Sequence, residues 1–155
     1  MNSKDLNLDS AIGPPSAAAA ILGGRESAFR SAGALRRLAG KRILLVEDEA
    51  LIAMDIQFAF EDEGAEVIGP AHSIDQALIA IAQNNVIDGA ILDVDLGGRD
   101  VFPVASLLHD RGVPFVFHTG HASQARLAEL FPSAKTCSKP AMPRALIEQL
   151  LGISH

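Results

Sequence analysis

The 155-residue sequence contains no tryptophan, no tyrosine and a single cysteine, Cys137. One cysteine cannot form an internal disulfide or a cysteine-based zinc site, which favours a reducing compartment. Without Trp and Tyr, stacking on nucleic-acid bases is an unexpected mode of binding. Basic residues are also scarce: 13 Lys and Arg stand against 19 Asp and Glu, so the net charge is −6. An acidic chain is poorly suited to neutralising nucleic-acid phosphates, and we expect no nucleic-acid partner.

Long apolar runs are absent as well. The longest candidate near the N-terminus, residues 17–22, is far shorter than the roughly 18 to 20 residues that span a bilayer. It follows acidic residues and the Pro14-Pro15 pair instead of the basic flank of a secretory signal. We therefore expect a cytoplasmic protein with no membrane partner. With 48% hydrophobic and 21% charged residues, the composition is that of a globular domain.

The chain divides near residue 41 into two parts of different composition. Residues 1–40 are rich in Ser, Gly, Pro and Ala and show little apolar periodicity, so we expect a flexible extension there, with one candidate helix over 25–38. Residues 1–42 hold seven basic and three acidic residues, a net charge of +4, whereas residues 43–155 hold six and sixteen, a net charge of −10. The basic extension is interpreted as a solvated linker, with docking on an acidic surface as the alternative.

Short apolar runs alternate with helical patterns over residues 41–151, which is typical of βαβ units. The expected strands cover residues 43–46, 65–68, 90–92, 114–117 and 135–138. Their uninterrupted apolar character suits parallel strands that are covered on both faces. Between them, apolar residues recur at helical spacing, as in Ile74, Ala77, Leu78 and Ile81. The pattern predicts an α/β domain with a doubly wound, five-stranded parallel sheet and helices on both faces.

Acidic side chains follow the first and third expected strands, at the sheet edge where open α/β proteins place their functional groups. Glu47 and Asp48 follow the first strand, and Asp93 ends the third. Converging carboxylates repel each other unless a cation neutralises them, and Mg²⁺ suits such oxygen ligands. Glu49 is better explained as the start of the next helix, where negative charge is favourable. The sequence therefore predicts a magnesium site at this edge.

The fourth and fifth expected strands end in Thr119-Gly120 and Lys139-Pro140. The ammonium of Lys139 is suited to hold an oxygen of a transferred phosphoryl group, and its alternative role is a salt bridge to Asp93. The Thr119 hydroxyl can donate to the same oxygen, although a lone strand-end threonine is more often structural.

Four segments together resemble the receiver domain of bacterial two-component response regulators. They are Val46-Glu47-Asp48-Glu49, Ile91-Leu92-Asp93-Val94-Asp95-Leu96, Phe117-His118-Thr119-Gly120 and Ser138-Lys139-Pro140. Because their order and spacing also fit, the resemblance covers about residues 41–151. It implies a flavodoxin-like sheet with the strand order 2-1-3-4-5 known for such receivers.

The resemblance also implies a role for each matching residue. Asp93 is the phosphoacceptor, Glu47, Asp48, Asp93 and the main-chain oxygen of Asp95 bind Mg²⁺, Thr119 is the switch hydroxyl, and Lys139 contacts the phosphoryl group before a cis proline, Pro140. A carboxylate that attacks an activated phosphorus, with cations to stabilise charge on the transferring oxygens, makes chemical sense of these residue types.

The implied function is that of a stand-alone receiver and not of an enzyme. A sensor histidine kinase or a histidine phosphotransfer protein would donate a phosphoryl group from its phosphohistidine, and phosphorylation would change the affinity for a downstream protein. As in the family, the output face would run from Ser123 to Leu151. We expect no output domain after Leu151, where four residues remain, and no DNA-binding module before residue 41.

The sequence departs from the family's pattern at several positions. Glu47 replaces the more usual aspartate, Thr136 stands where receivers carry a switch aromatic, and the loop after Asp95 lacks the common proline. One subgroup of single-domain receivers has a Phe-Ala-Thr-Gly-hydrophobic-Tyr motif, which residues 117–122 resemble in part. In this sequence, His118 stands at the position of the alanine and Ala122 at the position of the tyrosine. We expect His118 to be an ordinary strand-end histidine. We expect Cys137, in the fifth strand, to be a core residue.

Two alternative functions remain open. A degenerate receiver would keep the fold as a binding module and take no phosphate, which Thr136 and the altered loop favour. A haloacid dehalogenase-like phosphatase also uses an Asp-x-Asp motif and magnesium, which Asp93-Val94-Asp95 resembles. In those enzymes the motif follows the first strand, whereas here it follows the third.

Overall fold

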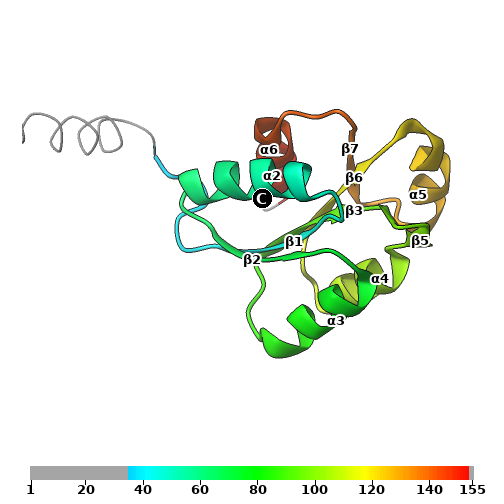
Figure 1. Ribbon diagram of the computed structural model, residues 1–155, viewed down its shortest axis with the longest axis horizontal. Helices are drawn as coiled ribbons and strands as arrows, with labels where there is room; N and C mark the ends of the chain where they lie inside the picture. The colour runs from blue at the N-terminus through cyan, green and yellow to red at the C-terminus, as the bar shows by residue number, and fades with distance from the viewer. Residues whose placement is uncertain (1–34, 154–155) are drawn as a thin grey trace, which may run out of the picture. The chain divides into compact units, whose positions relative to one another are not determined.

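A computed structural model describes residues 35–153 (Figure 1). Residues 1–34 of the expected extension over 1–40 therefore lie outside the described residues. So do residues 25–34 of the candidate helix over 25–38. Within the described range, no helix is both long enough and apolar enough to cross a membrane.

A five-stranded parallel sheet forms the centre of the domain (Figure 1). Its strands are β1 (Arg42–Val46), β2 (Glu66–Ala71), β3 (Gly89–Asp93), β6 (Phe115–Thr119) and β7 (Lys135–Ser138). They lie in the order β2-β1-β3-β6-β7. Counted along the chain over these five strands, the order is 2-1-3-4-5, which confirms the predicted topology.

Helices cover both faces of the sheet, as predicted. Helices α2 (Ala50–Asp62) and α6 (Pro143–Ile153) lie on one face, and α3 (Ile74–Gln83) and α4 (Phe102–Asp110) lie on the other (Figure 1). A short 3₁₀ helix, η2 (His121–Ser123), leads into α5 (Gln124–Leu130). Leu127 of α5 is buried in the same core layer as α3 and α4.

The core forms two layers, one on each side of the sheet. Along β1, Leu44 and Val46 belong to the layer beneath α3 and α4, whereas Ile43 and Leu45 belong to the layer beneath α2 and α6. This alternation follows from the pleat, which directs successive side chains to opposite faces. All four side chains are at most 2% exposed, which explains why the strand reads as an uninterrupted apolar run.

Two local features differ from the expected strands. The second strand continues past residue 68 to Ala71 through a cis Gly69–Pro70 bond, and the pairing of β1 with β2 shifts register there. A small antiparallel hairpin, β4 (Asp95–Leu96) and β5 (Arg99–Asp100), follows β3. Gly97 and Gly98 turn this hairpin with φ values of 63° and 85°, a conformation that glycine adopts at no steric cost.

The segment before β1 packs onto the domain. Leu38 is 2% exposed and belongs to the α2/α6 core layer. The Arg37 guanidinium pairs with the Glu63 carboxylate at 3.1 Å, and the Leu38 amide donates to the Glu63 carbonyl. The apolar contacts of the domain therefore begin a few residues before the composition changes at residue 41.

Candidate functional site

A cleft of about 390 Å³ opens at the carboxyl ends of β1, β3, β6 and β7. It is lined by Asp48, Glu49, Asp93, Asp95, Gly97, Thr119, Gly120, Ala122, Ser123 and Lys139. Five of the six predicted site residues thus line one cleft. They converge because parallel strands direct all their carboxyl ends to the same edge, although these residues lie far apart in the sequence.

Glu47, the sixth predicted residue, does not line the cleft. Its side chain is 1% exposed and lies beneath the cleft. Its Oε1 atom accepts a hydrogen bond from the Glu49 amide at 3.2 Å, and its backbone carbonyl lies 2.8 Å from the Nδ1 atom of His72. The Glu49 amide thus holds the Glu47 carboxylate, and His72 holds the Glu47 backbone.

Lys139 joins the buried and the exposed carboxylates. Its ammonium nitrogen lies 3.0 Å from Asp93 Oδ2, 3.4 Å from Glu47 Oε2 and 3.8 Å from Glu49 Oε1. The Lys139 amide donates to the Thr119 carbonyl at 2.8 Å, which fixes the backbone from which the side chain starts. The Lys139–Pro140 bond is cis, as predicted. One cation is thus shared among three acidic side chains.

Opposing effects set the ionisation of these groups. Burial and the charge of Glu47 raise the pKa of Asp93 to about 7, and Lys139 opposes that rise. Burial also raises the pKa of Glu47, but His118, Asp93 and Lys139 outweigh it and bring this pKa down to about 2. Burial lowers the pKa of Lys139, yet the two carboxylates outweigh it and the pKa is raised. An added cation would relieve the repulsion and favour the ionised form of Asp93.

The loop after β3 and the end of β6 complete the cleft. The Asp95 amide donates to Asp93 Oδ1 at 3.3 Å, while the Asp95 carboxylate accepts from the Gly98 amide at 2.7 Å. Thr119 is 2% exposed, and its hydroxyl donates to the Gly120 carbonyl at 3.0 Å. The Asp95 amide of the β4–β5 hairpin thus holds the Asp93 carboxylate, and Thr119 lines the same cleft.

The donor set fits a hard divalent cation. Oxygen atoms of Glu47, Asp48 and Glu49 all lie within 4.8 Å of one another, and Asp93 and Asp95 line the same cleft. Glu47 Oε2 is buried and accepts no hydrogen bond in the described part of the chain. Such carboxylate-rich, water-accessible sites suit Mg²⁺, which prefers oxygen ligands and keeps several waters.

Three residues near the site were not assigned a role from the sequence. Glu49 is the N-cap residue of α2 and makes no side-chain cap hydrogen bond, so its carboxylate faces the cleft and Lys139. His72 holds the Glu47 carbonyl. His118 is 2% exposed and pairs in register with Asp93 across β3 and β6. Of these three residues, only Glu49 could have been connected with the site from the sequence, because it directly follows the acidic pair Glu47-Asp48.

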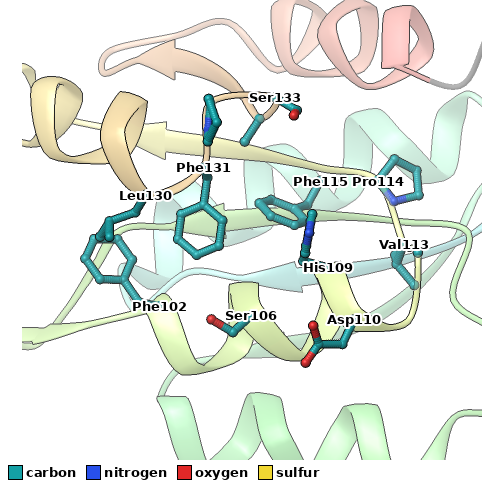
Figure 2. A pocket seen from close by; sticks show the side chains of 13 residues that line it. Phe102, Ser106, His109, Asp110, Val113, Pro114, Phe115, Leu130, Phe131 and Ser133 are labelled. Carbon is teal, nitrogen blue, oxygen red and sulfur yellow. The ribbon is translucent and has the colours of Figure 1, made fainter.

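A larger groove of about 950 Å³ lies away from this chemistry, between α4 and the end of α5 (Figure 2). The ring of Phe131 stands within it, with its centroid 5.8 Å from that of Phe102 and 6.0 Å from that of Phe115. Its lining is mainly apolar, and Asp110 is the one carboxylate among the lining residues. Among the described residues, carboxylates and an ammonium converge in the smaller acidic cleft, which is therefore the candidate site.

Residues 43–150 match the family model of the response regulator receiver domain. Among curated proteins, the phyllosphere-induced regulator PhyR of Methylorubrum extorquens is 36% identical over 115 residues, which are 70% of this chain and 43% of PhyR. The transcriptional regulatory protein PdtaR of Mycobacterium tuberculosis is 36% identical over 90 residues, 57% of this chain and 43% of PdtaR. The chain thus matches less than half the length of either relative.

Solved structures are similar over the same region. A response regulator receiver protein from Sinorhizobium medicae superposes with a TM-score of 0.66 at 26% identity and covers 74% of this chain and 94% of its own. SdrG from Sphingomonas melonis superposes with a TM-score of 0.63 at 33% identity, over 73% of this chain and 95% of its own. Both likenesses agree with the sheet order described above.

Proposed function

The chain belongs to the response regulator receiver domain family, and from this premise we propose that it is a phosphoryl-accepting signalling switch whose acceptor is Asp93. One observation carries the proposal. Asp93 sits in an acidic cleft with a carboxylate oxygen 3.0 Å from the Lys139 ammonium, so a nucleophile and a group that can hold a phosphoryl oxygen stand side by side.

Magnesium is part of the proposal. Asp48, Asp93 and the main-chain oxygen of Asp95 would hold the ion, with Glu47 beneath them as a fixed negative charge. When bound, Mg²⁺ supplies positive charge to the transferring phosphoryl oxygens. The same charge favours the ionised, nucleophilic form of Asp93.

The transfer step joins Asp93 to a phosphohistidine of the donor protein. A carboxylate oxygen of Asp93 forms a bond to phosphorus as the phosphorus–nitrogen bond breaks, and the departing imidazole nitrogen keeps the electron pair and takes a proton from solvent water. Lys139 leaves its ion pair with Asp93 for an oxygen of the transferred group. The Thr119 hydroxyl, now donating to the Gly120 carbonyl, turns to donate to the same group.

The proposed donor is a sensor histidine kinase or a histidine phosphotransfer protein, and the output is a changed affinity for a downstream protein. We assign the output face to the segment from Ser123 to Leu151, which holds α5, β7 and α6. Its connection to the cleft is the hydrogen bond from the Lys139 amide to the Thr119 carbonyl, which joins the ends of β7 and β6. A cytoplasmic location belongs to the same proposal, in line with the single cysteine.

The experiment is incubation with Mg²⁺ and acetyl phosphate, followed by intact mass. We expect one phosphoryl group per chain, lost in Asp93→Asn and retained in Asp110→Asn, a carboxylate remote from the cleft. Release of many phosphate equivalents per chain would support the phosphatase alternative instead. A complete lack of modification would support the degenerate receiver, which takes no phosphoryl group. Thr136 and the altered loop after Asp95 are the sequence features that favour this alternative.

A further inference from the structure

His118 and Glu47 form a buried pair beneath the cleft. The pairing of Val46 with Leu92 places the next residues, Glu47 and Asp93, side by side, and Asp93 pairs in turn with His118. The three side chains therefore form a lateral row across β1, β3 and β6, on the face that carries α2 and α6.

Both members of the pair are deeply buried. The side chains of His118 and Glu47 are 3% and 1% exposed, and the His118 Nδ1 atom lies 3.7 Å from Glu47 Oε2. Neither ring nitrogen of His118 nor Glu47 Oε2 makes a hydrogen bond in the described part of the chain. A buried ring nitrogen without a hydrogen-bond partner is unfavourable, so His118 gains by closing the distance to the carboxylate that it faces.

The Glu47 carboxylate also contacts Lys139. The Lys139 ammonium nitrogen lies 3.4 Å from Glu47 Oε2, the oxygen that faces His118, and 3.5 Å from Glu47 Oε1, which accepts from the Glu49 amide at 3.2 Å. One carboxylate thus contacts both His118 and Lys139. Glu47 departs from the common receiver pattern and His118 from the motif of the single-domain subgroup, and here the two side chains face each other.

We propose that His118 is a positioning residue: it holds Glu47 in its inward orientation, and Glu47 in turn holds the Lys139 ammonium beside Asp93. His118 does not line the cleft, and its ring faces the Glu47 carboxylate, so the proposed effect on Lys139 runs through Glu47. The consequence for phosphotransfer rests on the proposed function above, whereas the placement of Lys139 does not.

The first test reads the placement of Lys139 by NMR, without any phosphoryl donor. We expect protected Lys139 ammonium proton signals in the wild type and in His109→Ala, a histidine in the groove of Figure 2 and remote from the cleft. His118→Ala and Glu47→Gln should both lose that protection, and the double variant should lose no more than either single one. Unchanged Lys139 protection in His118→Ala, with the native fold retained, would overturn the proposal.

The second test measures the rate of phosphorylation by acetyl phosphate with Mg²⁺. Loss of a residue that orients a ligating group through a hydrogen bond typically lowers activity about ten- to a hundredfold. We therefore expect the phosphorylation rate of His118→Ala to fall by a factor of that size. The loss should nearly vanish in a Glu47→Gln background, and His118→Gln, which keeps an N–H donor, should recover part of the rate. Equal losses in both backgrounds would assign His118 a general packing role and contradict the proposal. A wild type that takes no phosphoryl group would refute the proposed function and leave the NMR test to decide on the pair.

Discussion

The Lys139 ammonium nitrogen lies 3.0 Å from Asp93 Oδ2 and 3.4 Å from Glu47 Oε2, so a single cation bridges the side chains of two strand ends that are 46 residues apart. The side chains of Asp93 and Glu47 are 5% and 1% exposed. Two buried negative charges against one positive charge leave an excess that the fold alone does not neutralise. In the proposed function, a divalent cation would neutralise this excess.

Replacing Lys139 should destabilise the fold and slow phosphorylation. In Lys139→Met, Glu47 and Asp93 lose their shared cation, and because Lys139 is only partly buried we expect the free energy of unfolding to fall by about 1–3 kcal/mol. Urea denaturation measures this loss. Lys135→Met, on the same strand but exposed, is the matched control and should change stability little. Equal effects of the two substitutions would contradict the role of the shared ion pair.

The stability of the magnesium-free protein should fall as the pH rises. The pKa of Asp93 is raised from 3.8 to about 7, so in that window the folded state binds more protons than the unfolded chain. Glu47, with its pKa lowered from 4.5 to about 2, is almost fully ionised in both states above about pH 5.5 and adds little slope there. The free energy of unfolding should therefore decrease from about pH 5.5 to about 7, by on the order of 1 kcal/mol per pH unit.

Asp93→Asn isolates this dependence, because it removes the titrating group at nearly constant shape. The difference in unfolding free energy between variant and wild type should grow as the pH rises through the window and then level off. Asp110→Asn should follow the wild-type curve. A constant difference between the wild type and Asp93→Asn across the window would show that Asp93 does not titrate as described.

Magnesium should stabilise the folded protein by mass action, and more strongly near pH 8 than near pH 5. The reason is that protons compete with the ion for Asp93 at the lower pH. Thermal unfolding at increasing Mg²⁺ measures the effect. Asp48→Asn, which removes a carboxylate that lines the cleft, should weaken the apparent affinity, whereas the exposed Glu66→Gln should not. Equal Mg²⁺ stabilisation of both variants would exclude Asp48 as a ligand.

The residues just before β1 should contribute to stability. Leu38 is 2% exposed, so Leu38→Ala should cost about 2–4 kcal/mol, whereas Leu35, which is 90% exposed, should tolerate alanine within about 0.5 kcal/mol. Chemical denaturation of the two variants gives this comparison directly. Similar values for the two would mean that the segment does not pack on the domain in solution.

Much of the architecture was predictable from local patterns. Apolar runs such as 43–46 and 90–92 located strands that are buried on both faces, and the rule for parallel sheets placed Asp48, Asp93, Thr119 and Lys139 at one edge. The strand order itself came from the resemblance to receivers, because apolar periodicity does not distinguish between the possible orders of five parallel strands.

Other features depend on contacts that a pattern does not carry. Whether the Glu47 side chain enters the cleft or lies beneath it depends on His118 and Lys139, which belong to other strands. The hairpin of β4 and β5 has two residues in each strand, too few for an alternating pattern. Leu38 follows a segment of low apolar periodicity, so its sequence context does not predict that it is buried. Its burial follows from its contact with the core layer of α2 and α6.

The central claim is that Asp93 accepts a phosphoryl group, and peptide mapping tests it most directly. The protein is incubated with Mg²⁺ and a small phosphoryl donor such as phosphoramidate, and the acyl phosphate is located by mass spectrometry of its proteolytic peptides. We predict one modification, on the peptide that contains Asp93, that requires Mg²⁺ and is absent from Asp93→Asn. A modification on any other residue, or none under conditions in which a known receiver is fully modified, would contradict the account.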